Sequence, residues 1–201
     1  MNIIRIVNSI YTSNTYILSA TDSNECWLID IGDVQPVLDN IPKNSTIKGI
    51  FLTHTHYDHI YGINTMIELY PACVVYTSEH GKDGLFSDKL NLSRYHDDMV
   101  VFAGSHIHLL HEDDTVELTS NVYLHVLETP GHDWSSLTYY TEKEIFTGDS
   151  YIPDLNVVTT FPRSSKEDAE ISTQKILHFA QGKNIYPGHG LEVIKYRDLI
   201  L

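Results

Sequence analysis

Three histidines and one aspartate lie within six residues of the segment IFLTHTHYDHIYG, at positions 50–62. Imidazole nitrogens and carboxylate oxygens are common metal ligands, and a buried polar group without a partner is costly. His54, His56 and Asp58 are two residues apart, so in an extended segment their side chains point the same way. His59 points elsewhere unless the chain has already turned into a helix. The spacing indicates metal ligands at a bend that follows a strand.

Three more candidate ligands stand beside glycines later in the chain, in the segments ETPGHDWSS, IFTGDS and YPGHG. Glycine lets a backbone turn and approach its neighbours closely, and loops at strand ends often hold catalytic groups. Five histidines and two aspartates are too many for one tetrahedral metal ion. We therefore expect two sites that share a carboxylate. His54, His56 and His132 would hold the first ion, Asp58, His59 and His189 the second, and Asp149 would bridge them.

A second histidine-rich segment, HIHLLHEDD at positions 106–114, looks like another metal site. Its alternation of apolar and polar residues is typical of a half-exposed strand that ends in an acidic turn. No further ligand set converges on it in the sequence. We therefore interpret its histidines as structural, together with His80, His96, His125 and His178.

Hairpins dominate the elements that must position these residues. We expect strands at 3–7, 14–19, 26–33, 47–52 and 72–78, short strands in VVFAG, HIHLL, TVEL and VYLHVLETPG, a hairpin at 137–149 and a last strand in NIYPGHG. We expect helices at 34–41, at 60–70 before Pro71, and after a capping box formed by Ser164 with Glu167 or Ser165 with Asp168. Residues 79–98 and 150–163 have irregular composition. The pattern predicts an α+β sandwich of two sheets with helices outside.

The composition places limits on the class of protein. The 201 residues carry a formal net charge of −14, have ordinary apolar content and contain only two cysteines. We expect one domain, residues 1–201, with Cys26 and Cys73 reduced and buried. Scattered lysine and arginine do not favour a nucleic-acid partner, and no apolar run is long enough for a membrane helix. The N-terminus lacks a signal-peptide pattern, so we expect a cytoplasmic protein that acts on a small molecule.

At this point the motifs resemble a known family. HTHYDHIYG matches the His-x-His-x-Asp-His-x-x-Gly motif of the metallo-β-lactamase fold superfamily, and TPGH, FTGD and YPGHG match its later motifs in order. The chain is most similar to the glyoxalase II-like (hydroxyacylglutathione hydrolase-like) enzymes, whose pattern also includes an Asn-Leu-Ser stretch such as 91–93 here. The resemblance implies a four-layer αβ/βα sandwich of two mixed sheets. It also implies that the seven residues named above bind metal, and that Asp58 orients the nucleophile.

The chain also departs from the family pattern. After TPGH the family commonly continues Thr-x-Gly, whereas Asp133, Trp134, Ser135 and Ser136 stand here. The usual Gly-Asp-Thr is Gly-Asp-Ser at 148–150. The sequence ends soon after His189, so we expect no counterpart of the C-terminal helical extension that helps glyoxalase II to bind glutathione.

The resemblance and the ligand chemistry together predict a dinuclear hydrolase in which a metal-bridging hydroxide attacks a small thioester or a related ester. A histidine-rich ligand set favours two zinc ions, with iron or manganese as alternatives. A lactonase or a phosphodiesterase on the same core is the nearest alternative, and a mononuclear iron persulfide dioxygenase is a different one. A non-catalytic binding protein is disfavoured because all seven ligand types are present, and a nuclease is disfavoured by the acidic charge.

Residues around the candidate ligands suggest further roles. Asp30 is a candidate acceptor for a ligand imidazole, whereas Asp33 is read as a helix-cap or turn residue. Arg163 is either an anion clamp for a substrate carboxylate or a solvated residue before a helix. The aromatic residues that could line a pocket are Tyr57, Tyr61, Trp134, Tyr151 and Phe161.

Overall fold

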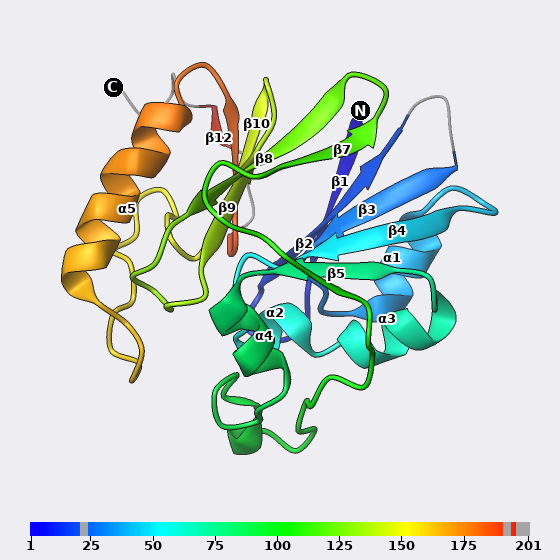
Figure 1. The fold of residues 1–201 in the computed structure, drawn as a ribbon, viewed down its shortest axis with the longest axis horizontal. Coiled ribbons are helices and arrows are strands. Elements are labelled where there is room, and N and C mark those ends of the chain that lie inside the picture. Colours follow the sequence, from blue (N-terminus) through cyan, green and yellow to red (C-terminus); the bar gives the residue numbers. More distant parts are fainter. Residues whose placement is uncertain (21–23, 191–193, 196–201) are drawn as a thin grey trace.

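The computed structural model describes residues 1–20, 24–190 and 194–195, and its strands form two six-stranded sheets (Figure 1). The first sheet has the order β1-β2-β3-β4-β5-β6: β1 (Asn2–Val7), β2 (Asn14–Ser19), β3 (Glu25–Ile29), β4 (Thr46–Phe51), β5 (Val74–Thr77) and β6 (Ile107–Leu109). The second has the order β12-β11-β10-β9-β8-β7: β7 (Thr115–Thr119), β8 (Val122–Glu128), β9 (Leu137–Tyr140), β10 (Glu144–Gly148), β11 (Asn184–Pro187) and β12 (Ile194–Lys195).

Both sheets are mixed. In the first, β1, β2 and β3 pair antiparallel, and β3 through β6 pair parallel. In the second, only the β10–β11 pair is parallel among the described strands. The carboxyl ends of β10 and β11 therefore meet at the same edge, which brings the loops after them together.

The helices lie outside the two sheets (Figure 1). They are α1 (Val34–Asn40), α2 (Tyr57–Ile60), α3 (Ile63–Leu69), α4 (Glu79–Leu85), the 3₁₀ turn η1 (Ser93–Tyr95) and α5 (Lys166–Phe179). The first four cover the outer face of the first sheet, and α5 covers the second. The expected four-layer αβ/βα sandwich is confirmed.

Three apolar layers hold this sandwich together, and alternation along the strands builds them. In β2, Tyr16 and Leu18 belong to the cluster between the sheets, which also contains Tyr139 and Phe146 of the second sheet. The intervening Ile17 points to the other face and joins the cluster beneath the outer helices. A third, smaller cluster packs α5 against β10 and β11. Each buried side chain of this size contributes about 1.5–3 kcal/mol to folding.

Several predicted elements differ from the observed ones. The strand expected at 26–33 ends at Ile29, because Asp30 has a left-handed backbone (φ +57°) that turns the chain. The helix expected at 60–70 is two helices, α2 and α3, separated at Gly62. A Cβ on Gly62 would collide with the carbonyl oxygen of Gly32, so this residue fits a close approach of two backbones.

The middle of the chain contains further corrections. The stretch expected to be irregular, 79–98, contains α4 and η1. VVFAG at 100–104 is not a strand, although Val100 and Phe102 are buried in alternation as a strand would have them. The hairpin at 137–149 is confirmed as β9 and β10. At α5 the Ser165 hydroxyl accepts a hydrogen bond from the Asp168 N–H, so the second of the two proposed caps is the one formed.

Two other expectations concern the described residues as a whole. Cys26 and Cys73 are free and buried, as predicted. Among the helices that the structure describes, none has the length and apolar character needed to cross a membrane.

Candidate metal centre

All seven candidate ligands lie on loops or helix starts at one edge of the sandwich. His54 and His56 follow β4, and the chain turns into α2 directly after them, so Asp58 and His59 belong to a helix. This turn redirects His59, as the spacing required. The remaining three residues, His132, Asp149 and His189, follow β8, β10 and β11. The structure therefore joins residues of both sheets in one cluster.

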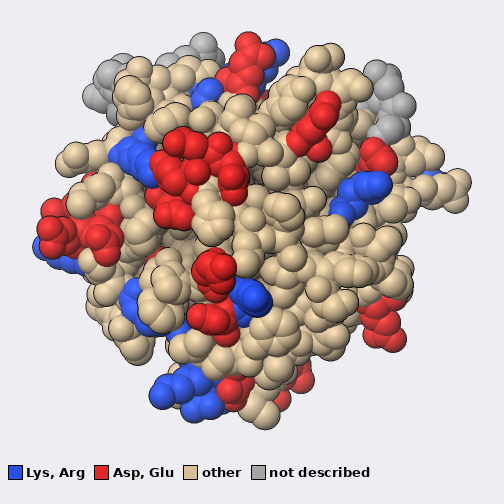
Figure 2. Space-filling view, in the orientation of Figure 1, with Lys and Arg blue, Asp and Glu red and all other residues tan. Residues whose placement is uncertain are grey.

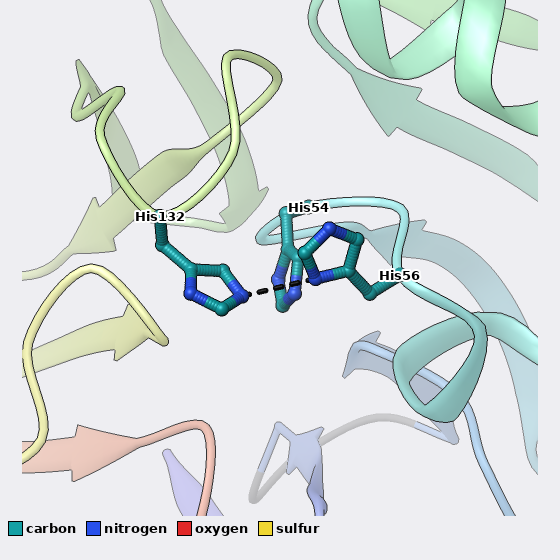
Figure 3. Close-up of side chains that lie close together, drawn as sticks. All are labelled: His54, His56 and His132. Carbon is teal, nitrogen blue, oxygen red and sulfur yellow. Dashed lines mark hydrogen bonds between the residues drawn. The ribbon is translucent and has the colours of Figure 1, made fainter. Parts of the chain in front are cut away.

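The first group contains the side chains of His54, His56 and His132, whose potential ligand atoms all lie within 4.8 Å of one another. Figure 3 shows the His132 ring approaching the other two from the opposite loop, with its Nε2 2.9 Å from His56 Nδ1. The three residues are at most 5% exposed. Three imidazoles facing one another at this distance suit a single metal ion such as zinc.

The second group contains Asp58, His59 and His189, and its potential ligand atoms also lie within 4.8 Å of one another. Asp58 Oδ2 is 3.4 Å from His59 Nε2 and 3.3 Å from His189 Nε2. The two Nε2 atoms are 3.4 Å apart. A carboxylate with two imidazoles is again a suitable ligand set for a divalent transition metal.

Asp149 lies between the two groups. Its Oδ2 is 3.5 Å from His132 Nε2 of the first group and 3.3 Å from His189 Nε2 of the second, and its Oδ1 is 3.5 Å from His59 Nε2. It also forms an overlapping group with His54 and His59. The carboxylate thus has the position that a bridging ligand requires.

The ring nitrogens that face away from the centre have acceptors behind them. His132 Nδ1 is 3.0 Å from the Val158 carbonyl oxygen, and His189 Nδ1 is 2.9 Å from the Tyr11 carbonyl oxygen. Because each acceptor takes the N–H of its ring, the opposite nitrogen keeps its lone pair for the centre. Tyr11 and the next residue both have left-handed backbones, which direct that carbonyl towards His189.

Asp30 contacts two candidate ligands, His59 directly and His54 through Thr53. Its Oδ2 is 2.9 Å from His59 Nδ1 and accepts the Thr53 hydroxyl at 2.7 Å, while its Oδ1 accepts the Thr53 N–H. Because the Thr53 hydroxyl donates its hydrogen bond to Asp30, its oxygen can accept one from His54 Nδ1, which is 3.2 Å away. The expected contact between Asp30 and the imidazole of a candidate ligand, His59, is confirmed. The same carboxylate also reaches His54 through Thr53.

Unpaired buried atoms test whether the residues suit a metal. His54 Nε2 and Asp149 Oδ1 are buried side-chain atoms without a hydrogen-bond partner in the protein. Such atoms are costly unless something else satisfies them. Both belong to residues of the cluster and both are metal-ligand types, so the donor set fits bound metal ions.

Without metal, the carboxylates and imidazoles of the cluster shift one another's pKa. Burial alone would lower the pKa of His59, but the carboxylates of Asp58, Asp149 and Asp30 raise it to about 9. Burial likewise opposes protonation of His189, yet hydrogen bonds to Asp149 and Asp58 raise its pKa to about 11. Burial, together with the neighbouring imidazoles, holds the pKa of His54 well below its ordinary value. Without metal, protons therefore occupy the imidazoles of the second group, because Asp58 belongs to this group and Asp149 and Asp30 lie beside it.

Sequence reasoning missed the role of Asp133, which was noted only as a departure from the family pattern. It is 1% exposed, and its Oδ2 is 3.5 Å from His56 Nε2 and 3.2 Å from an Arg163 nitrogen. Arg163 therefore pairs with a buried carboxylate of the protein and is not a solvated residue before the helix. An aspartate directly after a candidate ligand was the available signal, but its contact partner could not be read from the sequence.

The other flanking residues have varied roles. Phe161 packs its ring 4.9 Å from that of His56, so it borders the first group. Tyr57 is buried in the core and stacks on His96. Asp33 does not cap α1 with its side chain but accepts hydrogen bonds from Ser9 and from the Tyr61 hydroxyl.

The Asn-Leu-Ser stretch is structural in this fold. The Asn91 amide donates to the carbonyl oxygens of Gly84 and Val100, and Leu92 has a left-handed backbone. These bonds tie the segment after α4 to residues 100–104. The Trp134 ring stacks on His80, and Tyr151 packs beside α5.

Comparison with known families identifies related sequences. The family model described as the metallo-beta-lactamase superfamily matches residues 11–196. A probable metallo-hydrolase of Streptococcus pyogenes serotype M6 is 31% identical over 198 residues, which cover 94% of this chain and 84% of that protein. A hydroxyacylglutathione hydrolase of Erwinia tasmaniensis is 31% identical over 134 residues, covering 64% of this chain and 43% of that enzyme. The chain thus matches less than half of that hydrolase.

Solved structures share the fold at lower identity. The BLEG-1 B3 metallo-beta-lactamase superposes with a TM-score of 0.87 at 24% identity, covering 98% of this chain and 95% of that one. TTHA1623, solved in a di-iron-bound form, gives 0.80 at 19% identity over 96% and 95% of the two chains. ETHE1 from Myxococcus xanthus gives 0.77 at 22% identity over 98% and 81%.

Proposed function

Because this chain belongs to the metallo-beta-lactamase superfamily, we propose that it is a dinuclear metal-dependent hydrolase that cleaves a small thioester or a related ester. One observation carries the proposal. Two groups of ligand-type side chains face each other, and the two oxygens of Asp149 lie between them. A pair of adjacent metal ions is a recurrent arrangement in hydrolytic enzymes.

The proposed ligands keep the division made from the sequence. His54, His56 and His132 would hold one ion, Asp58, His59 and His189 the other, and Asp149 would contact both. When bound, the ions would supply Lewis acidity and lower the pKa of a coordinated water. Asp58 would also orient the attacking water, because its carboxylate is partly exposed at the edge of the cluster. Phe161 would exclude bulk water beside the first group.

Zinc is the proposed metal, because five imidazoles and few carboxylates suit it. Iron is the main competitor, since the similar fold of TTHA1623 has been solved in a di-iron-bound form. Metal analysis of protein purified from its native host separates the two. Two zinc ions per chain are expected, and two iron ions would leave the hydrolase proposal intact but correct the metal.

A thioester is the proposed substrate because hydroxyacylglutathione hydrolases are among the similar sequences. Those matches cover only about half of each hydrolase, so the glutathione part of their substrate is left out of the proposal. The acidic net charge supports a small molecule rather than a nucleic acid. On the face shown in Figure 2, Lys and Arg are dispersed among acidic side chains, whereas phosphate backbones favour concentrated positive charge.

A hydrolysis panel on metal-quantified protein tests the proposal. Thioesters of small acyl groups, lactones and phosphodiesters would be compared by kcat/KM before and after chelation. The expected result is a preference of about tenfold or more for a thioester, corresponding to about 1.4 kcal/mol in the transition state. Activity should vanish on chelation and return with zinc. Cleavage of none of these substrates by protein holding two ions would overturn the proposal.

A second candidate is a mononuclear iron persulfide dioxygenase. The group His54, His59 and Asp149 has two imidazoles and one carboxylate, the ligand composition of many non-haem iron oxygenases. One iron per chain, with oxygen consumption in the presence of a persulfide, would favour this candidate. Two ions per chain without oxygen uptake would exclude it.

A further inference from the structure

We propose that Asp133, held by Arg163, is a positioning residue for His56, and that this pair sets the metal affinity of the first ligand group. The inference rests on the proposed metal centre. It assigns a role to two residues that lie behind the ligands and do not belong to either ligand group.

The contact with His56 is made at the nitrogen that faces away from the cluster. His56 Nδ1 points to His132 Nε2, 2.9 Å away, while His56 Nε2 faces Asp133 Oδ2 at 3.5 Å. His56 Nε2 is buried and has no hydrogen-bond partner within the protein at shorter range. The carboxylate is therefore the group placed to receive this N–H. A small rotation of the ring would bring the two atoms into hydrogen-bond range.

Asp133 is itself fixed on both oxygens. Its Oδ1 accepts the Ser135 N–H at 2.9 Å and the Ser135 hydroxyl at 2.5 Å. Its Oδ2 accepts from Arg163 Nε and Nη2 at 3.3 and 3.2 Å. The carboxylate is 1% exposed. Because so little freedom is left, its position fixes where the His56 ring can lie.

Arg163 is anchored in turn. Besides Asp133, its guanidinium donates to the Leu90 carbonyl oxygen and lies 5.3 Å from the centre of the Trp134 ring. That ring stacks on His80 of α4 at 4.1 Å. The pair therefore ties the loop that carries His132 to the segment after α4 and to the loop before α5. The charges of Arg163 and Asp133 balance each other within the protein.

The carboxylate distinguishes His56 from the other imidazoles of its group. Behind His54 lies the Thr53 hydroxyl, and behind His132 lies the Val158 carbonyl, both uncharged. Only a carboxylate strengthens the ligand by its negative charge as well as by orientation. In the second group, Asp30 stands behind His59 in the same way. Each proposed metal ion would thus have one carboxylate-backed histidine.

The test measures the two ligand groups separately, using two background variants that each remove one proposed ligand from one group. Zn²⁺ binding would be measured by competition with a chromophoric chelator in two backgrounds, H189A, which weakens the second group, and H132A, which weakens the first. Asp133→Asn should weaken Zn²⁺ binding about 10- to 100-fold in the H189A background. In the H132A background the change should stay within about threefold.

Two further variants keep the test independent of folding. Asp133→Asn combined with Arg163→Gln removes both charges, so that no unpaired buried charge remains, and it should show the same selective loss. Arg94→Gln breaks an exposed ion pair with Asp88 on a nearby segment and serves as the matched control. Thermal unfolding of each metal-free variant shows whether the fold is retained.

The outcomes are distinguishable. Equal weakening in both backgrounds would reduce Asp133 to a structural residue and overturn the inference, as would unchanged affinity in the H189A background. If the unmodified protein bound no Zn²⁺, the proposed centre itself would fail. Two bound ions with an Asp133→Asn variant of unchanged affinity would leave the centre standing and remove only this inference.

Discussion

Two histidine-rich segments of this chain, residues 54–59 and residues 106–111, have similar sequences and very different surroundings. In the first, all three histidines are at most 5% exposed, and three loops bring His132, Asp149 and His189 to them. In the second, His106 comes just before the edge strand β6 and His108 lies within it, and both are exposed. The His111 ring faces one carboxylate, that of Glu128, with His111 Nδ1 4.0 Å from a Glu128 oxygen at the surface.

The comparison teaches that composition alone does not make a metal centre. What differs is the supporting layer: each imidazole of the first segment has an acceptor behind it, supplied by Thr53, Asp133 or Asp30. In the described part of the chain, the histidines of the second segment form no group of three potential ligands. A buried position, a fixed tautomer and convergence from distant strands are all required.

The largest loss of metal binding and activity is expected when two of the proposed ligands are removed. His54→Ala combined with Asp149→Ala should abolish metal binding and lower kcat/KM about a thousandfold or more, since bound metals supply several kcal/mol of transition-state stabilisation. Metal analysis and kinetics on folded protein check both effects. Intact activity in this double variant would show that the centre lies elsewhere.

A smaller loss should follow from crowding a ligand without removing it. A Cβ added at Gly188 would collide with Asp149 Oδ1 and with the backbone of Gly148. Gly188→Ala should displace the carboxylate and lower activity about a hundredfold, as misplacement by an ångström can do. Gly182→Ala is the control for backbone strain without crowding, because Gly182 has a φ of +78° and nothing lies within 4 Å of its Cβ. Equal activity of the two variants would contradict the expectation.

Proton release offers a graded test on the unmodified protein. The pKa of His59 is raised to about 9 and that of His189 to about 11, so both are protonated at pH 7 without metal. Metal ions compete with these protons, and apparent affinity should therefore rise with pH from about 6 to 9. Calorimetry in buffers of different ionisation enthalpy should detect about two protons released per chain. Binding heats that do not depend on the buffer would refute this.

The smallest effect is expected in the second segment. His106→Ala combined with His108→Ala should leave metal content unchanged and kcat/KM within about twofold, because substitutions of exposed side chains usually change the free energy of unfolding by about 0.5 kcal/mol or less. The same assays apply. A loss of one metal ion per chain would mean that the second segment binds metal after all.

The sequence predicted which ligand-type side chains come together better than it predicted the segments around them. His54 and Asp149 could be identified because ligand chemistry restricts residue type, and glycines mark sharp turns. The helix α4 was missed because Gly81 and Gly84 disfavour helices. In the structure, these glycines let the helix approach Thr77 and Thr55, where a Cβ would collide. Such a tertiary contact has no local signature.

At residues 100–104 the sequence predicts a strand, but the structure has none. Their alternation of burial is that of a strand, but the Val100 carbonyl accepts from the Asn91 side chain, and the Phe102 N–H donates to Leu85. The alternation of apolar residues predicts which side chains are buried, but it does not show that the hydrogen-bond partners are the end of α4 and the segment after it, and not a strand. The Asp133–Arg163 pair was missed for a related reason, because the two residues are distant in sequence and meet only in the folded chain.

The proposed ligands come from both sheets, with His54, His56, Asp58 and His59 on the first side and His132, Asp149 and His189 on the second. Bound metal would therefore link the two sheets of the sandwich and stabilise their packing. Each ion present at a hundred times its Kd would add about 2.7 kcal/mol to the free energy of unfolding. Protein made in a metal-starved cell would open more often and be degraded sooner, so metal supply would control its abundance as well as its activity.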